Sequence, residues 1–292
     1  MNECNEAPNF SSNDFPVESY RVTADTADPS FSLRARPEHE IICVKQGEMT
    51  LHLNDVSYAA SAGDMYFVQS GTLLSVTGMT PSCVYEVVTF DLYRIVGNDV
   101  AGIAYSQHLQ DNTWRVTAYL GRNPLGLREI FNRAYRAASS KQRRIGSDLE
   151  LRGLILQFIG CILQDGRWHT SEQLLDHDAK AQKAVRRVLS LIEENYAQEL
   201  TLADMAAAAE LSPNYFCRYF KKIAGCSPVE YLIDYRLNMA AYMLITTDDS
   251  ISDISLACGF NDASHFIKFF RRKKGVTPRN YRQLHTKQSI GR

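Results

Sequence analysis

The 292-residue chain lacks the features of a membrane-spanning or exported protein. No stretch reaches about 18 consecutive apolar residues, which is the length that a transmembrane helix needs. Its N-terminus does not combine a basic segment with an apolar run, as a secretory signal peptide does. We therefore expect a cytoplasmic protein with no membrane-spanning segment.

The spacing of cysteine argues against a disulfide framework and against a structural zinc site. The seven cysteines are scattered, odd in number and without a Cys-x-x-Cys pair. Disulfide scaffolds and zinc sites both depend on short, paired spacings. We expect reduced thiols and no cofactor.

Motifs of common enzyme classes are also missing. The chain has no Gly-rich phosphate loop, no nucleophile elbow and no His-Glu-x-x-His sequence. His39, Glu40 and His52 are candidate metal ligands, but a metal site requires several side chains to converge. Their spacing does not predict such a set, so we expect no catalytic or metal-binding residues. A metal-dependent enzyme remains the weaker alternative.

The net charge of −1 conceals an asymmetry along the chain. Residues 183–292 carry 16 Lys and Arg against 11 Asp and Glu, a net charge of +5, which leaves −6 for the remainder. Positive charge attracts the phosphates of nucleic acid. The C-terminal part is therefore the candidate for contact with DNA.

An internal repeat occupies this basic part. Residues 202–205 correspond to residues 251–254, an offset of 49, and residues 216–222 correspond to residues 266–272, an offset of 50. The second segment of each copy is rich in aromatic and basic residues. A helix pair that ends in a basic, aromatic helix and occurs twice predicts two helix-turn-helix units on adjacent turns of DNA.

The second helix of each copy has an aromatic face and a polar face. Ser212 and Asp262 occupy equivalent positions and are good N-cap residues. The aromatic residues recur at helical spacing, which predicts a buried stripe: Phe216, Tyr219, Phe220, Phe266, Phe269 and Phe270. The predicted DNA-binding residues are Asn214, Cys217, Arg218, Lys221, Lys222, Ala263, Ser264, His265, Lys268 and Arg271. A small helical bundle with solvated basic faces is the alternative.

Residues 184–283 resemble the DNA-binding domain of AraC-family transcription regulators. The resemblance rests on residues 211–222, Leu-Ser-Pro-Asn-Tyr-Phe-Cys-Arg-Tyr-Phe-Lys-Lys, on motifs within residues 251–266, and on residues 275–282, Gly-Val-Thr-Pro-Arg-Asn-Tyr-Arg. It covers about a third of the chain. The resemblance implies seven helices, with two helix-turn-helix units joined by a long helix at about residues 228–245.

The N-terminal part is predicted to form strands between Ser32 and about Leu92. The predicted strands are Ile41–Val44, Met49–Leu53, Val56–Ala59, Met65–Val68 and Val84–Phe90. Short strands with regular turns predict an antiparallel sandwich or barrel. The spacing of His39, Gly47, Gly63 and Gly71 resembles the cupin-like sensor barrel of the same family. The expected fold class is therefore α+β, with an N-terminal cupin-like β-barrel and a C-terminal all-α domain.

A barrel of this size can hold a small molecule inside it. Arg36 and Glu40 lie at the entry to the first strong strand, and Tyr85 and Val87 share one face of the last strand with Thr89. If the resemblance carries over, one or more of these residues meets the ligand, and relatives suggest a sugar. The alternative is that Arg36 and Glu40 are surface ions while Tyr85 and Val87 belong to the core.

Two helices are predicted after the strands, at Leu125–Ala138 and Ser147–Leu163. Two such helices after a barrel resemble the dimerisation helices of the family, and the second is apolar around much of its circumference, so we expect a homodimer. The alternative is that this apolar face belongs to the core of the domain. We expect an N-terminal domain at residues 1–165, a linker at residues 166–182 and a DNA-binding domain at residues 183–292.

Together these features predict a sequence-specific, DNA-binding transcription regulator. A ligand in the barrel would shift the orientation of the linked DNA-binding domains through its different affinity for two states. The expected output is activation of carbohydrate-utilisation genes through contact with RNA polymerase, while repression stays open. The alternative is a ligand-independent regulator whose barrel only dimerises.

Overall fold

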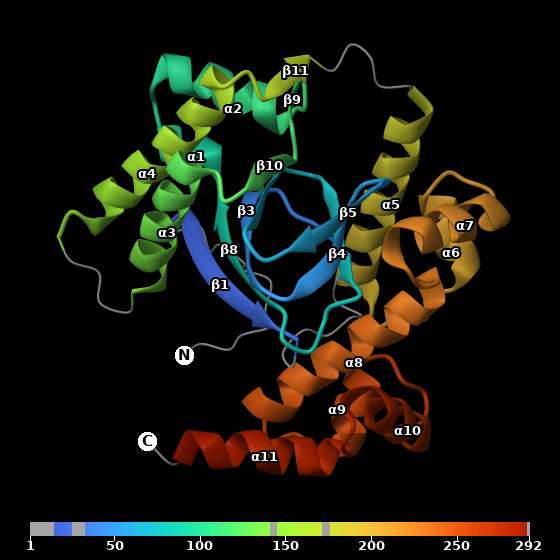
Figure 1. Ribbon diagram of the computed structural model, residues 1–292. Coiled ribbons are helices and arrows are strands. Elements are labelled where there is room, and N and C mark those ends of the chain that lie inside the picture. The colour runs from blue at the N-terminus through green and yellow to red at the C-terminus, as the bar shows by residue number, and fades with distance from the viewer. Residues whose placement is uncertain (1–14, 25–32, 141–144, 171–175, 291–292) are drawn as a thin grey trace. The chain divides into compact units, whose positions relative to one another are not determined.

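The structure, a computed structural model, forms two compact units. It describes residues 15–24, 33–140, 145–170 and 176–290 (Figure 1). The first unit is Met1–Ala179 and the second is Lys180–Arg292. Within the described residues, no helix is both long and apolar enough to cross a membrane.

The first unit contains two antiparallel sheets. Strands β1 to β8 are Val17–Thr23, Arg34–Ala35, His39–Gln46, Glu48–Leu53, Val56–Ser61, Asp64–Val68, Leu73–Thr77 and Val84–Phe90, and β10 is Tyr119–Arg122. One sheet has the order β1-β8-β3-β6-β10 and the other has the order β2-β7-β4-β5. All five predicted strands are confirmed as β3, β4, β5, β6 and β8.

An apolar core fills the space between the two sheets. Inward-facing Ile42 of β3 and Val87 of β8 pack in one cluster with Leu51 of β4 and Val76 of β7. Because strand side chains alternate between faces, the intervening residues of β3 and β8 point away from this core. The result confirms the predicted cupin-like architecture of facing sheets around a shared interior.

Helices cover the outer face of the five-stranded sheet (Figure 1). They are α1 at Leu92–Val96, α2 at Val100–Gln110, α3 at Leu125–Ser139 and α4 at Ser147–Gln164. Ile41 and Val88 pack there against Phe131 of α3 and Phe158 of α4. A two-stranded ribbon joins β9, Trp114–Val116, to β11, Trp168–Thr170. Strand β11 therefore lies within the range predicted as the linker, residues 166–182.

Seven helices form the second unit over its described residues, as the resemblance implied. They are α5 at Asp176–Asn195, α6 at Leu202–Ala208, α7 at Pro213–Ala224, α8 at Pro228–Thr246, α9 at Ile251–Ala257, α10 at Ala263–Lys274 and α11 at Pro278–Ile290. The pairs α6–α7 and α9–α10 are the two predicted helix-turn-helix units, and α8 is the long helix that connects them.

Candidate DNA-binding surface and interior polar cluster

The first helix-turn-helix unit begins at a complete capping box. The Thr201 hydroxyl accepts from the backbone N–H of Asp204 at 3.2 Å, and the Asp204 carboxylate accepts from the N–H of Thr201 at 2.8 Å. Ser212 occupies the predicted N-cap position of α7, but its side chain forms no capping hydrogen bond. Pro213, with its fixed backbone angle, begins this helix instead.

Helix α7 buries its aromatic face and exposes its polar face. Phe216 and Phe220 are completely buried, and Tyr219 is almost so. The Phe220 ring packs edge-on against Tyr231 of α8, with ring centroids 5.6 Å apart. The predicted DNA contacts Asn214, Arg218, Lys221 and Lys222 are exposed, whereas Cys217 is half-buried.

Helix α10 repeats this arrangement in the second unit's other half. The Asp262 carboxylate accepts from the Ser264 N–H at 2.9 Å, which confirms the predicted cap. Phe266 and Phe270 are completely buried, while Phe269 is half-buried rather than buried as predicted. The remaining predicted contacts are exposed, except for half-buried Ala263: Ser264, His265, Lys268 and Arg271.

Polar contacts fix α10 against the connecting helix. Lys273 Nζ lies 2.8 Å from the Asp234 carboxylate of α8, and Lys274 Nζ donates to the Asn238 side chain at 2.5 Å. The two lysines follow Arg271 and Arg272 in sequence but serve a different purpose. They hold the helix, which leaves the exposed cations before them available to a ligand.

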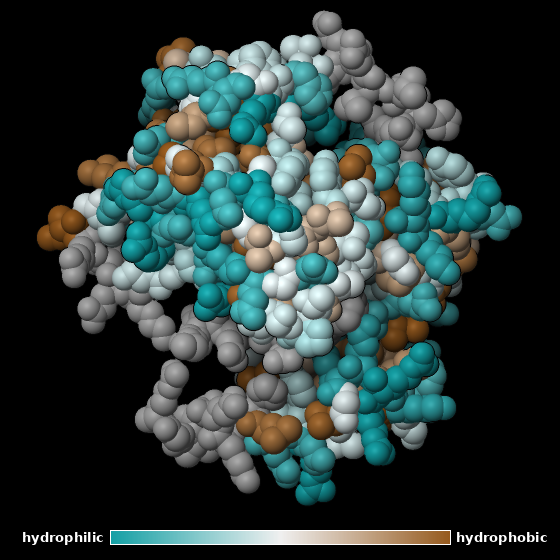
Figure 2. Space-filling view, in the orientation of Figure 1, coloured by the Kyte–Doolittle hydropathy of each residue, from teal (hydrophilic) through white to brown (hydrophobic). Residues whose placement is uncertain are grey.

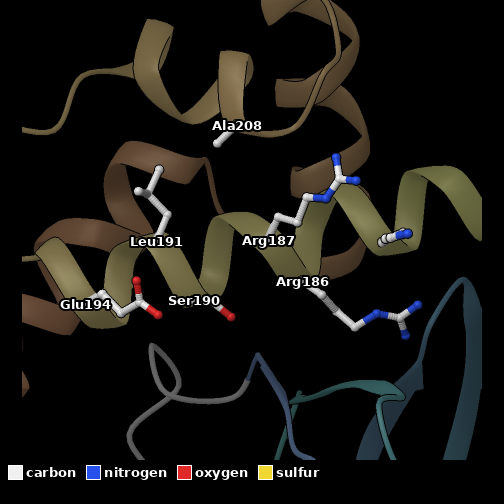
Figure 3. Close-up of a pocket in the computed structure, with 7 residues that line it drawn as sticks. Arg186, Arg187, Ser190, Leu191, Glu194 and Ala208 are labelled. Atoms are coloured by element: carbon white, nitrogen blue, oxygen red, sulfur yellow. The ribbon is translucent and has the colours of Figure 1, made fainter.

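A shallow open pocket lies elsewhere in the second unit, between α5 and α6. Figure 3 shows its lining residues, which are Lys183, Arg186, Arg187, Ser190, Leu191, Glu194 and Ala208. Arg187 pairs with the exposed Glu210 at 2.7 Å. The pocket includes no residue of α7 or α10, and none of its lining residues is a predicted functional residue.

A cluster of charged and phenolic groups lies between the sheets of the first unit. Arg34 of β2 donates to the Glu40 carboxylate from Nη2 at 2.8 Å and from Nε at 3.2 Å. Its Nη2 also donates to the Tyr20 hydroxyl at 3.0 Å. Only 3% of the Glu40 side chain is exposed. The cluster is thus a buried ion pair with a phenol bound to it.

The cluster shifts the ionisation of its members. Burial alone would raise the pKa of Glu40, but Arg34 and Arg36 outweigh it and hold this pKa below its usual value. Burial raises the pKa of Tyr20 and that of Tyr85, so both phenols keep their protons. The carboxylate is ionised at neutral pH, and the two phenols can donate hydrogen bonds.

Three buried polar atoms of this region have no hydrogen-bond partner. Nε of Arg36 lies 3.5 Å from Glu40 Oε1, yet Nε and Nη1 of Arg36 are buried and form no hydrogen bond. The hydroxyl of Thr89 is also buried and unpaired. Thr89 lies directly opposite Glu40 in the β3–β8 ladder, so the two side chains share a face.

The structure brings together three of the four predicted ligand contacts. Glu40, Arg36 and Tyr85 belong to this cluster, and Val87 lies in the adjoining apolar core. Neither Arg36 nor Glu40 is a surface ion, because their side chains are only 13% and 3% exposed. Sequence reasoning missed Arg34 and Tyr20, which lie on strands that it did not predict.

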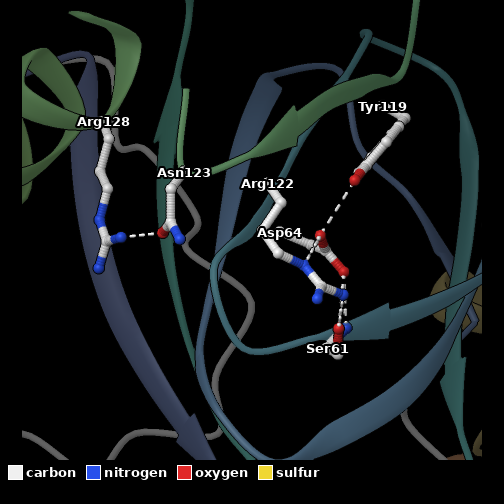
Figure 4. A network of polar contacts seen from close by, with 6 residues as sticks. All are labelled: Ser61, Asp64, Tyr119, Arg122, Asn123 and Arg128. Atoms are coloured by element: carbon white, nitrogen blue, oxygen red, sulfur yellow. Dashed lines mark hydrogen bonds and ion pairs between the residues drawn. The ribbon is translucent and has the colours of Figure 1, made fainter. Parts of the chain in front are cut away.

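A second polar network has a structural role (Figure 4). The Asp64 carboxylate accepts hydrogen bonds from the Ser61 N–H at 2.8 Å, the Tyr119 hydroxyl at 3.1 Å and Arg122 Nε at 3.2 Å. Burial would raise the pKa of Asp64, but these donors outweigh it and lower the pKa. The network joins β10 to β6 and leaves Asp64 fully satisfied.

The three candidate metal ligands lie in separate environments. His39 points to the helix-covered face, where its ring contacts Phe67 and Phe90 and its Nδ1 accepts from the Ser70 N–H at 3.0 Å. Glu40 points to the interior. His52 bonds to hydroxyls on the neighbouring strands. Within the described residues, no group of three or more His, Cys, Asp or Glu side chains could hold a metal ion.

The N-terminal unit has an interior polar cluster, and the C-terminal unit has paired helices of the recognition type. This combination is typical of a two-domain transcription regulator. A family model for the AraC-like ligand binding domain matches residues 16–159, and a model for a helix-turn-helix domain matches residues 205–284. The chain belongs to the AraC family of DNA-binding transcriptional regulators.

The chain is also similar to individual curated regulators and to solved structures. The HTH-type transcriptional activator RhaS of Klebsiella pneumoniae is 26% identical over 277 residues, which cover 90% of this chain and 93% of that protein. The melibiose operon regulatory protein of Escherichia coli is 36% identical over 104 residues, or 36% of this chain and 34% of that protein. Among solved structures, ToxT of Vibrio cholerae is 13% identical with a TM-score of 0.46, over 91% of this chain and 97% of that chain.

Proposed function

We propose that the exposed faces of α7 and α10 read a specific DNA sequence. The observation that carries this proposal is the repeated division of each helix into a buried aromatic face and an exposed polar face. Two such helices can enter successive major-groove segments, about 34 Å apart along B-DNA. Short polar groups at the helix starts suit base edges, and cations further along suit phosphates.

The individual contacts follow from this arrangement. Arg218 is the strongest candidate for base readout, because a guanidinium that pairs with guanine contributes about 1–3 kcal/mol of discrimination. Lys221, Lys222 and Arg271 would neutralise phosphates. The other proposed base contacts are Asn214, Ser264, His265 and Lys268. Cys217 and Ala263, which are half-buried, would supply only short packing contacts.

A binding titration tests the DNA function. DNA from upstream of the protein's own gene and its neighbours is titrated at two salt concentrations with wild type, Arg218→Ala and Arg136→Ala. Arg136 is an exposed cation in the first unit and therefore a charge-matched control. We expect sequence-selective wild-type binding that weakens steeply with salt, with selectivity at one base position lost only in Arg218→Ala. Binding that is indifferent to sequence and to Arg218 would refute the proposal.

We further propose that a small-molecule effector binds at the interior cluster and controls DNA binding. The support is a buried site with unpaired donors, Arg36 and Thr89, in the part of the chain that matches a ligand-binding domain. A carbohydrate is the proposed class, since one relative regulates a melibiose operon. The proposed output is activation of nearby genes through RNA polymerase, and the chain would act by binding rather than by catalysis.

The proposed homodimer would form through α4. Leu149, Gly153, Leu156 and Gly160 recur at heptad spacing on one side of this helix, and Leu149 and Leu156 are 75% and 43% exposed. Nothing lies within 4 Å of a Cβ placed on either glycine, so a second helix could approach closely. Figure 2 shows apolar atoms at the edge of the molecule where α4 begins.

Sedimentation analysis tests the dimer with a matched pair of variants. Leu156→Glu should give a monomer, because a carboxylate would be buried in the interface without a partner. Gln107→Glu adds the same charge to an exposed residue of α2, outside the proposed interface, and should leave the dimer intact. A dimer that survives Leu156→Glu would place the interface elsewhere, and a monomeric wild type would refute the homodimer.

A further inference from the structure

The exposed face of α10 contains one aliphatic side chain. Ile267 is 38% exposed, and it is the only exposed large hydrophobic residue of α7 and α10, two helices that the structure describes completely. Its equivalent in the first copy of the repeat, at an offset of 50, is the half-buried Cys217. The two helices therefore differ at a position that the repeat makes equivalent.

Ile267 lies among the proposed DNA contacts of α10. Residues three and four apart are neighbours on the surface of a helix, so Ile267 adjoins Ser264 on the turn before it and Arg271 on the turn after it. Both neighbours are exposed, as is Lys268, which follows Ile267 directly. An apolar side chain thus lies inside the polar and cationic surface that we propose faces DNA.

The side chain of Ile267 is stiff and is directed toward the start of α10. A β-branched side chain in a helix has one strongly preferred rotamer, so it loses little freedom when it makes a contact. Helical side chains also point back toward the N-terminus of their helix. Because a recognition helix places its N-terminal residues against base edges, this direction carries the Ile267 side chain toward the bases.

Thymine is the base that an aliphatic side chain can distinguish. In the major groove the edges of guanine, cytosine and adenine present hydrogen-bonding groups, whereas thymine also presents a C5-methyl group. Isoleucine cannot replace the hydrogen bonds to water that a covered polar edge would lose. Contact with a methyl group instead removes apolar surface of both partners from water. Ile267 should therefore favour a thymine.

We propose that Ile267 contacts the C5-methyl group of a thymine in the half-site bound by α10. This inference rests on the proposed DNA-reading function and names the base that the second helix selects. It makes the two halves chemically different, because Arg218 of α7 would select its base through hydrogen bonds. The thymine should lie about 10 base pairs from the base read by Arg218, since the two helices enter successive major-groove segments.

Replacement of thymine by uracil tests the contact, because it removes only the methyl group. The probe is the DNA fragment that wild type binds selectively, synthesised with deoxyuridine in place of one thymine at a time. Uracil at one thymine, about 10 base pairs from the base read by Arg218, should weaken wild-type binding about fourfold. This change corresponds to about 0.8 kcal/mol, the value for burial of one group of this size.

A matched pair of variants assigns the effect to Ile267. Ile267→Ala should bind the thymine and uracil fragments equally, and it should fold because the residue is exposed and alanine is the better helix former. Ile245→Ala makes the same change at a 44% exposed position of α8 and should keep the fourfold preference for thymine. Ile267→Val retains a β-branched side chain and should keep part of that preference. Circular dichroism checks that each variant is folded.

The outcomes separate this contact from the proposed DNA function. Selective wild-type binding in which no thymine is sensitive to uracil would refute the contact and preserve the proposed function. A uracil effect that persists unchanged in Ile267→Ala, or that lies in the half-site affected by Arg218→Ala, would also refute the contact alone. If wild type binds no fragment selectively, both the contact and the proposed function fail.

Discussion

Glu40→Gln should destabilise the first unit by about 3 kcal/mol. Glu40 is the only carboxylate bonded to Arg34 and Arg36 among the described residues, and its side chain is 3% exposed. Removal of one partner from a buried ion pair costs about 3–5 kcal/mol, because the other charge stays buried. Glutamine keeps one acceptor oxygen for Arg34, which places the expected loss at the lower end of this range.

The same substitution at an exposed ion pair provides the control. Glu150 lies 3.2 Å from Arg133, with about half of each side chain exposed. Exposed pairs of this kind contribute about 0–1 kcal/mol, so Glu150→Gln should be nearly neutral. Because both variants lose one negative charge from the same unit, the difference between them measures burial rather than net charge.

Tryptophan fluorescence during urea unfolding isolates the first unit. The chain has only two tryptophans, Trp114 and Trp168, and both lie in that unit with their rings 4.4 Å apart. The second unit has tyrosines but no tryptophan. In a thermal scan, a loss of about 3 kcal/mol in the free energy of unfolding lowers the unfolding temperature by about 6–12 °C for a domain of this size.

Lowering the pH should narrow the difference in the free energy of unfolding between wild type and Glu40→Gln. Arg34 and Arg36 keep the pKa of Glu40 below its usual value despite burial. The carboxylate therefore stabilises the fold fully above the unfolded pKa of about 4.3 and loses this effect as the pH falls through the folded pKa. A gap no larger than that of Glu150→Gln, or one that acid does not narrow, would refute a buried, ionised Glu40.

Three further predictions concern the packing and protonation of other residues. Gly259→Ala should destabilise the second unit by about 1–3 kcal/mol in circular-dichroism unfolding, because φ is +79° and a Cβ would lie 2.8 Å from the Tyr196 carbonyl oxygen. Phe270→Ala should cost that unit about 3–5 kcal/mol through a core cavity, with an unchanged tryptophan transition. Burial lowers the pKa of His39 to about 4, so the unfolded chain protonates His39 at a higher pH than the folded chain does. The contribution of His39 should therefore fall by up to about 1.4 kcal/mol per pH unit between pH 6.5 and 4, and a fluorescence-detected stability with no such slope would contradict a neutral, buried His39.

The helical second unit was predictable because its signals are local. Phe216 and Phe220 lie one helical turn apart, and Phe266 and Phe270 repeat that spacing, so the buried face follows from the sequence. The N-cap at Asp262 also depends only on its neighbours. Ser212 shows the limit, because a good capping residue occupied the N-cap position without forming the bond.

The strands of the first unit were predictable only where they are strongly apolar. β3 and β8 are buried on both faces and read as apolar runs, whereas β1 is mostly half-exposed and includes Glu18, Ser19 and Arg21. The partner of β1 is β8, which begins more than sixty residues away. Its pairing depends on long-range contacts, so local composition carried no signal for it.

The interior cluster illustrates the same limit at the level of function. Glu40 and Tyr85 were candidates because they lie on strong strands, but Arg34 occupies a two-residue strand that is too short for any periodicity. Only the fold brings the Arg34 guanidinium to Glu40 and reveals the unpaired donors of Arg36. The sequence could therefore predict which strands face the interior without predicting the ion pairs inside it.

Net charge and interior charge lead to opposite expectations for this part of the chain. The charges of the residues before 183 sum to −6. This sum describes the long-range electrostatic field of the unit and does not describe the charges in its interior. Inside the first unit the screening by water is largely lost, so a buried charge responds to its immediate neighbours more than to distant carboxylates. An acidic unit can thus enclose an interior in which a carboxylate lies next to two arginines. The ionisation of Glu40 is set by Arg34 and Arg36 beside it and not by the composition of the domain around it.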